Sequence, residues 1–149
     1  MNELQREAVV RLLTAEDCSC VIRHGDTIRL FRGRGVSDLL RLLHEEPDFL
    51  RGSFVADKVV GKGAAALMIA GGVAGLWAGI ISRPALDLLA GSQMKVAFGE
   101  EVPAIINRAG TGLCPVEQAC AGCTTAEECL PRIENFFRQV AERRQYSVE

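Results

Sequence analysis

The stretch that decides the fold runs from residue 53 to residue 98 and reads SFVADKVVGKGAAALMIAGGVAGLWAGIISRPALDLLAGSQMKVAF. In it, segments rich in Val, Ile and aromatic residues alternate with segments of Ala and Leu at helical spacing. The pattern predicts strands over 53–60, 73–82 and 94–98 and helices over 61–70 and 83–91. Helices that alternate with apolar strands are typical of an α/β protein.

The flanking residues extend this pattern on both sides. Apolar positions at helical spacing predict a first helix that ends near Thr14, and residues 18–31 read as a hairpin. Ser37 is placed to cap a second helix that Pro47 ends, and a last helix is expected over 126–143. We therefore predict one domain that spans 1–149, a three-layer α/β sandwich with a mixed sheet and extra C-terminal helices.

Composition excludes several classes of protein. With 149 residues, 48% hydrophobic and 24% charged, the chain can build one core and is not disordered as a whole. Its net charge of -2 leaves no surplus of Lys and Arg for phosphates, so we expect no nucleic-acid partner. The first residues read as a charged amphipathic helix rather than a signal peptide, and six cysteines in such a chain indicate a reducing compartment. We therefore expect a cytoplasmic protein.

Residues 63–82 contain no Lys, Arg, Asp or Glu, and such a run is long enough to span a bilayer. Gly71 and Gly72 interrupt it, however, and its many small residues supply little energy for insertion. The segment therefore predicts a helix, a turn and a buried strand, with no membrane partner.

The sequence Gly61-Lys62-Gly63 follows a predicted strand and opens a predicted helix, in the loose form G-x-G-x-x-A of a dinucleotide-binding turn. Free N–H groups at a helix start favour an anion, and Lys62 adds positive charge. Against a dinucleotide, Ser82-Arg83 follows the next strand where an acidic residue is usual. Close packing of a Gly/Ala helix against a sheet is the simpler alternative.

Two patterns contain the residue types of metal sites. The segment 44–46 (HEE) and the pair Cys120 and Cys123 together resemble the motifs of zinc deaminases, but His44 ends its predicted helix and no Pro precedes Cys120. A second alternative is a four-thiolate site formed by Cys114, Cys120, Cys123 and Cys129. Buried thiols explain these cysteines more simply, so we expect neither a metal nor a cofactor.

Cys114 precedes Pro115 and lies three residues before Glu117, which is the spacing of a helix N-cap. A thiol at the positive end of a helix has a lowered pKa, so Cys114 is a candidate nucleophile. The alternative is a plain helix start in which Glu117 closes a capping box.

Three short segments carry a resemblance to a known family: DKVVGK at 57–62, Asn107-Arg108 and CPVE at 114–117. With the order of elements around them, the chain resembles an uncharacterised bacterial family of domains of unknown function with a cytidine-deaminase-like fold. The resemblance covers nearly the whole chain.

The resemblance implies a groove without zinc chemistry. In zinc deaminases one helix begins with His/Cys-x-Glu and the next with Pro-Cys-x-x-Cys. Here the corresponding starts are Gly61-Lys62-Gly63 and the segment 84–88, PALDL, so the proline is present and the metal ligands are absent. Hydrolytic deamination by that route is therefore not expected.

These observations favour a protein that binds a small anionic or nucleotide-like molecule. The residues expected to bind it are Gly61, Lys62, Gly63, Ser82, Asn107 and Arg108, and the candidate catalytic residues are Asp57, Lys58 and Cys114. A surface ion pair is the alternative for Asp57 and Lys58. A thiol or metal protein built on the C-terminal cysteines and a non-catalytic interaction module are the alternative functions. Whether the protein is an enzyme stays open, and a homo-oligomer is compatible with it.

Overall fold

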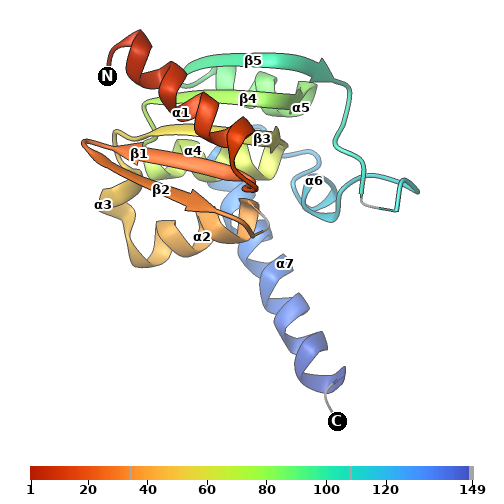
Figure 1. Cartoon of the computed structure of the whole chain (residues 1–149). Coiled ribbons are helices and arrows are strands. Elements are labelled where there is room, and N and C mark those ends of the chain that lie inside the picture. The colour runs from red at the N-terminus through yellow and green to blue at the C-terminus, as the bar shows by residue number, and fades with distance from the viewer. Residues whose placement is uncertain (34, 108, 148–149) are drawn as a thin grey trace.

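The computed structural model describes residues 1–33, 35–107 and 109–147. Five strands alternate with helices along the chain (Figure 1). The strands are β1 (Cys20–His24), β2 (Thr27–Phe31), β3 (Phe54–Val60), β4 (Gly75–Ser82) and β5 (Lys95–Val102). The helices are α1 (Glu3–Ala15), α2 (Gly35–Glu45), α3 (Pro47–Leu50), α4 (Lys62–Gly71), α5 (Arg83–Ala90), α6 (Pro115–Ala119) and α7 (Ala126–Ser147).

The strands form a single mixed sheet in the order β2-β1-β3-β4-β5. The hairpin strands β1 and β2 are antiparallel, and β1 also pairs antiparallel with β3. The strands β3, β4 and β5 are parallel, and each crossover carries a helix, α4 or α5. The predicted α/β class, the mixed sheet and the additional C-terminal helices are confirmed.

Three boundaries differ by more than two residues from the sequence-based expectation, and one of them is the end of α7, which lies at Ser147 rather than at residue 143. The last strand continues to Val102, four residues beyond the predicted end, because its pairing with β4 runs from Lys95 to Val102. Residues 99–102, GEEV, carry no apolar alternation, which an edge strand does not need. In addition, α2 begins at Gly35 rather than after Ser37.

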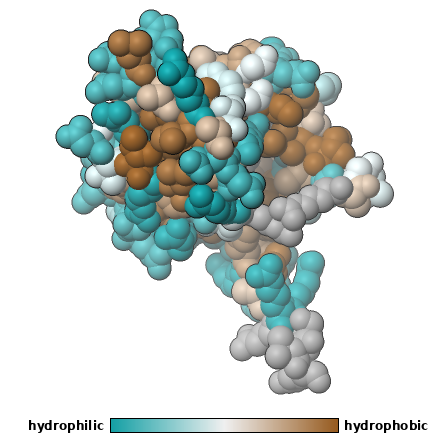
Figure 2. Space-filling view, viewed as in Figure 1, coloured by the Kyte–Doolittle hydropathy of each residue, from teal (hydrophilic) through white to brown (hydrophobic). Residues whose placement is uncertain are grey.

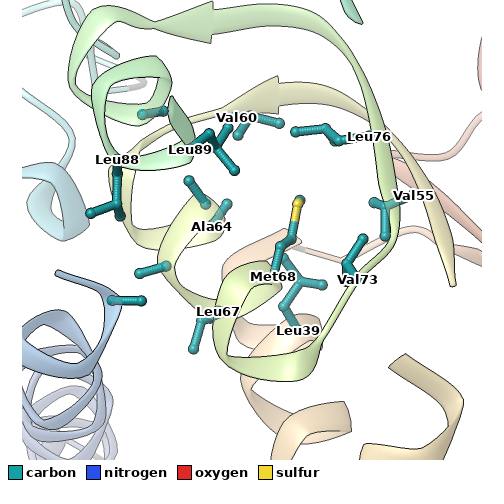
Figure 3. Close-up of a cluster of buried hydrophobic side chains, with 14 of the residues drawn as sticks. Leu39, Val55, Val60, Ala64, Leu67, Met68, Val73, Leu76, Leu88 and Leu89 are labelled. Carbon is teal, nitrogen blue, oxygen red and sulfur yellow. The ribbon is translucent and has the colours of Figure 1, made fainter. Parts of the chain in front are cut away.

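The back of the sheet, defined here as the face covered by α2, α4 and α5, holds the main core. Leucine, valine and alanine side chains from these helices pack on the strands, and Met68 of α4 lies in the middle of the cluster, whereas Leu67 points away from the strands (Figure 3). The last helix, α7, packs on α4, and its C-terminal part extends away from the sheet (Figure 1). Residues 63–82 divide between α4 and β4, and no described helix is long and apolar enough to cross a membrane.

Among the described residues, α1 is the helix that covers the front of the sheet. Val9 and Leu13 of α1 pack on Val21, Phe54 and Ala56 of β1 and β3. Because α1 lies over β1 and β3, a groove opens beside it over β4 and β5. The two faces of the sheet are therefore covered to different extents.

Side chains on β3 and β4 stop alternating near the ends of both strands. Val55 and Val60 both belong to the back core, although five residues separate them and a regular strand would place them on opposite faces. The same irregularity separates Ala78 from Ile81 on β4. Each strand thus delivers its last residues to the back, where α4 and α5 begin.

Candidate functional site

The starts of α4 and α5 lie side by side because they follow neighbouring parallel strands. Gly61 is the N-cap of α4 and Ser82 is the N-cap of α5. The hydroxyl of Ser82 accepts a hydrogen bond from the backbone N–H of Ala85 at 3.3 Å. The positive ends of two helix dipoles therefore point to one place, which we call the α4–α5 cradle and define by Gly61, Lys62 and Ser82.

A carboxylate from the C-terminal segment occupies this cradle. Glu117 of α6, only 7% exposed, accepts a hydrogen bond on Oε1 from the backbone N–H of Lys62 at 3.1 Å. The same oxygen accepts a second hydrogen bond from the Ser82 hydroxyl at 2.7 Å. The two helix starts therefore hold an anion that belongs to the chain itself.

The two glycines of the motif make room for α6. A Cβ at Gly61 would lie 2.7 Å from Oε1 of Glu117, and a Cβ at Gly63 would clash with Val116. The Lys62 ammonium donates to the carbonyl oxygen of Cys123 at 2.5 Å. The two glycines therefore do allow close packing, but the element that packs on them is α6 and not the sheet.

Glu117 is the residue of this site that the sequence analysis did not assign to it. The alternative in which Glu117 closes a capping box is wrong, because no side-chain cap bond forms at Cys114 and the Glu117 carboxylate bonds to α4 and α5 instead. The signal available in the sequence was a glutamate just inside a short helix that follows Gly- and Cys-containing turns. Nothing local tells that it will reach residues 35 and 55 positions earlier.

Asp57 lies apart from the cradle contacts. It is 3% exposed on the back of β3, and its Oδ2 would lie 3.4 Å from a Cβ placed on Gly35, at the start of α2. Oδ1 accepts a hydrogen bond from the backbone N–H of Val59 at 3.3 Å, and Oδ2 has no partner among the described residues. A surface ion pair with Lys58 is therefore wrong, because Asp57 is buried while Lys58 is exposed.

Burial sets the protonation of Asp57. The pKa of its carboxyl is raised to about 7, chiefly by loss of solvation; the backbone N–H groups of Val59 and Lys58 lower it, and the nearby Asp38 makes a smaller contribution that raises it. The pKa of Asp38, in the first turn of α2, is raised as well, first by burial. Asp57 is therefore close to half-protonated at neutral pH.

The remaining predicted binding residues lie in the segment between β5 and α6. Asn107 closes its own loop, since its Oδ1 accepts from the backbone N–H of Thr111 at 3.0 Å and its Nδ2 donates to the Thr111 hydroxyl at 3.2 Å. Arg108 lies outside the described residues. Cys114 is the half-buried N-cap of α6, as predicted, and its backbone N–H donates to Ile105 at 2.9 Å.

Three of the four C-terminal cysteines gather beneath α4. The Cys129 thiol is hydrogen-bonded to those of Cys120 and Cys123, and all three are buried. Burial raises the pKa of Cys120, and burial with the neighbouring thiols raises the pKa of Cys129 to about 12. Such thiols are weak nucleophiles at neutral pH. Within the described ranges, no three His, Cys, Asp or Glu side chains are placed to hold a metal ion.

His44, which the sequence analysis considered with Cys120 and Cys123 as a deaminase-like pattern, forms an ion-pair contact that supports the fold. His44, near the end of α2, pairs through Nε2 with Oε2 of Glu134 at 3.0 Å. This contact joins α2 to α7.

Comparison with known proteins places this architecture in a family. Residues 8–137 match the family model described as TM1506, domain of unknown function (DUF1893). The chain is similar to the crystal structure of a DUF1893 family protein (TM1506) from Thermotoga maritima, with 24% identity, a TM-score of 0.82 and 91% of each chain covered. At that identity the likeness shows a shared fold. No curated protein matches the chain. Since the family model covers most of the sequence, this chain belongs to the TM1506 family of domains of unknown function, DUF1893.

Proposed function

We propose that this protein binds a small anionic, nucleotide-like molecule in the α4–α5 cradle, where an anionic oxygen of the ligand takes the place of the Glu117 carboxylate. The observation that carries the proposal is the convergence of two donors from two helix starts on Oε1 of Glu117. An oxygen of a phosphate or carboxylate group matches both donors and the helix dipoles.

The proposal includes a cytidine-deaminase-like arrangement of β3, α4, β4 and α5. In zinc deaminases the starts of two such helices carry the metal ligands and the catalytic glutamate. In this chain the same positions hold Gly61-Lys62-Gly63 and Ser82, which offer N–H groups, a hydroxyl and an ammonium. These groups bind anions and supply no general base, so the proposed activity is binding rather than hydrolytic deamination.

Binding at the cradle requires a movement of α6. Glu117 would leave the cradle together with Val116, which packs against Gly63. If the Cys123 carbonyl moves with the same segment, the Lys62 ammonium becomes free to pair with the ligand. Cys114 is the N-cap of α6 and would move with it. Asp57 and Lys58 would not, because among the described residues they make no hydrogen bond to this segment.

The test compares Glu117→Gln with the natural chain. The amide keeps the size of the side chain and removes the charge that competes with a ligand. Orthophosphate and a nucleoside monophosphate, titrated by calorimetry, should bind Glu117→Gln about tenfold more tightly, because a charge-assisted competitor is replaced by a neutral one. Adding Ser82→Ala should reverse the gain.

A matched control is Glu127→Gln, which changes an exposed glutamate at the start of α7. It should leave both affinities unchanged. If neither anion binds the natural chain or Glu117→Gln at millimolar concentration, the cradle holds only Glu117 and the proposed function is wrong.

A further inference from the structure

The groove on the front of the sheet is a second, open site. It lies between α1 and the first residues of β4 and β5, with a cavity volume of about 720 Å³. Small-molecule sites are typically about 300–1,000 Å³ and mostly apolar, with a few polar groups placed to orient the ligand. The floor here is apolar, with Val10 of α1, Phe54 of β3, Trp77 of β4 and Ala97 of β5.

Two cations that border this apolar floor make no ion pair among the described residues. Arg6 makes no ion pair among the described residues, and its Nε is buried with no hydrogen-bond partner. Its guanidinium lies over the Phe54 ring, 5.9 Å from the ring centroid. Lys95, the first residue of β5, is exposed and likewise has no ion pair in the described part of the chain.

The other charged groups of the groove limit the charge of a ligand. Arg11 is paired with Glu7 at 4.0 Å, so these two charges offset each other. Glu3 borders the groove and has no ion pair among the described residues. Arg6, Lys95 and Glu3 together leave one positive charge to be neutralised, and a buried guanidinium N–H without a partner costs free energy until an acceptor reaches it.

We propose that this groove binds an amphipathic monoanion with a hydrocarbon body and a single carboxylate-type head. The body would lie on Phe54, Trp77 and Val10, and the head would accept hydrogen bonds from Arg6 and Lys95. A nucleobase fits less well, because the floor presents no polar side chain to its edge. A neutral apolar ligand also fits less well, because it would leave both Arg6 and Lys95 without a partner.

The single tryptophan of the chain, Trp77, reports on the groove directly. Three probes separate body from head: octanoate has both, 1-octanol has the body alone and acetate has the head alone. Octanoate should change the Trp77 fluorescence with a saturable curve. 1-Octanol should bind about tenfold more weakly, and acetate should have no effect.

Variants then test the cations. Arg6→Gln and Lys95→Gln should each weaken octanoate binding by about tenfold, whereas Arg51→Gln, at an exposed arginine paired with Asp48, should not. Glu117→Gln should leave octanoate binding unchanged, so failure at the cradle and failure at the groove are distinguishable. The proposal is overturned if octanoate and 1-octanol bind equally or if neither groove variant has an effect. It is also overturned if sedimentation shows that a second copy closes the groove and shields Trp77.

Discussion

On the back of the sheet, the starts of α4 and α5 meet a carboxylate that the chain supplies itself, whereas on the front Arg6 and Lys95 border an open groove and make no ion pair among the described residues. Glu117 reaches the back because α6 follows a long connection from β5 and packs on α4. On the front, α1 crosses the sheet obliquely and packs mainly on β1 and β3 (Figure 1). In the space-filling view, hydrophobic side chains remain visible among hydrophilic ones (Figure 2).

This contrast shows that a group of hydrogen-bond donors suited to an anion can already be occupied by a carboxylate of the chain itself, so that an external anion must displace it. Donors at helix starts need an acceptor whether or not the protein binds a ligand, and an internal carboxylate supplies one. Arg6 and Lys95 beside the apolar groove are different, since neither makes an ion pair in the described part of the chain and Glu3 offsets only one of the two positive charges. Substitutions on the back should therefore change the free energy of unfolding strongly, whereas substitutions of the two cations on the front should change it little.

The largest expected effect is on the back, at the unpaired carboxyl of Asp57. Its pKa of about 7 in the folded protein exceeds the ordinary unfolded value, so the folded state keeps a proton that the unfolded state releases. The stabilisation is complete below about pH 4 and is lost as pH rises to about 7, a change of about 4 kcal/mol. Asp57→Asn should remove most of this slope and be the more stable protein at pH 8.

Urea unfolding of both proteins at pH 5 and pH 8 measures the slope. Asp38 contributes in the same direction, so a smaller slope should remain in Asp57→Asn. Asp48→Asn, at a side chain that is 92% exposed, is the control and should not change the slope. An identical pH dependence in the natural chain and Asp57→Asn would show that Asp57 has an ordinary pKa.

The next effect concerns the anion that closes the cradle. Glu117→Ala removes the acceptor of the Lys62 N–H and the Ser82 hydroxyl, and each orphaned donor costs roughly 1–3 kcal/mol. We expect a loss of about 3 kcal/mol in the free energy of unfolding. The sharper measurement is rescue: high phosphate or acetate should restore part of the melting temperature of Glu117→Ala and none of that of Glu127→Ala.

The packing of α6 on α4 is expected to matter somewhat less. Gly63→Ala places a methyl group against Val116, and overpacking of this kind costs roughly 1–3 kcal/mol. Adding Val116→Ala should recover much of the loss, because it removes the clashing methyl group. Gly112→Ala is the control, since a Cβ there meets nothing within 4 Å. Equal melting temperatures for Gly63→Ala and the natural chain would mean that α6 does not hold the cradle closed.

Most of the fold could be predicted from the sequence because its signals are local. The alternating apolar segments placed β3, α4, β4 and α5 within two residues of their observed bounds. The end of β5 could not be predicted, since residues 99–102 have polar and glycine side chains and depend on pairing with β4. The break in alternation on β3 and β4 was not predicted, although Gly79 inside β4 was an available signal, because a glycine within a strand often marks a bulge or a close approach of another backbone.

The candidate site was predictable only in part. Gly61, Lys62, Gly63 and Ser82 were correctly placed at the helix starts, because helix starts and strand ends are local features. Glu117 was missed because the contact joins residues far apart in the sequence. The groove was missed for the same reason: Arg6, Trp77 and Lys95 come from three distant segments and have no shared motif.

The smallest expected effect is on the front, where substitution of the two cations should leave the stability of the protein nearly unchanged. Lys95 is exposed and has no ion pair among the described residues, so Lys95→Gln should change the free energy of unfolding by less than about 0.5 kcal/mol. Arg6→Gln should cost slightly more, because the partly buried guanidinium lies over the Phe54 ring and a cation–π contact contributes about 0.5–1 kcal/mol or somewhat more when it is partly desolvated. Urea unfolding measures both, with Arg51→Gln as the reference for a surface arginine. A loss above about 2 kcal/mol at either position would mean that the cation supports the fold rather than standing free for a ligand. Small losses of stability, together with a large loss of octanoate affinity in the same two proteins, would separate binding from folding on this face.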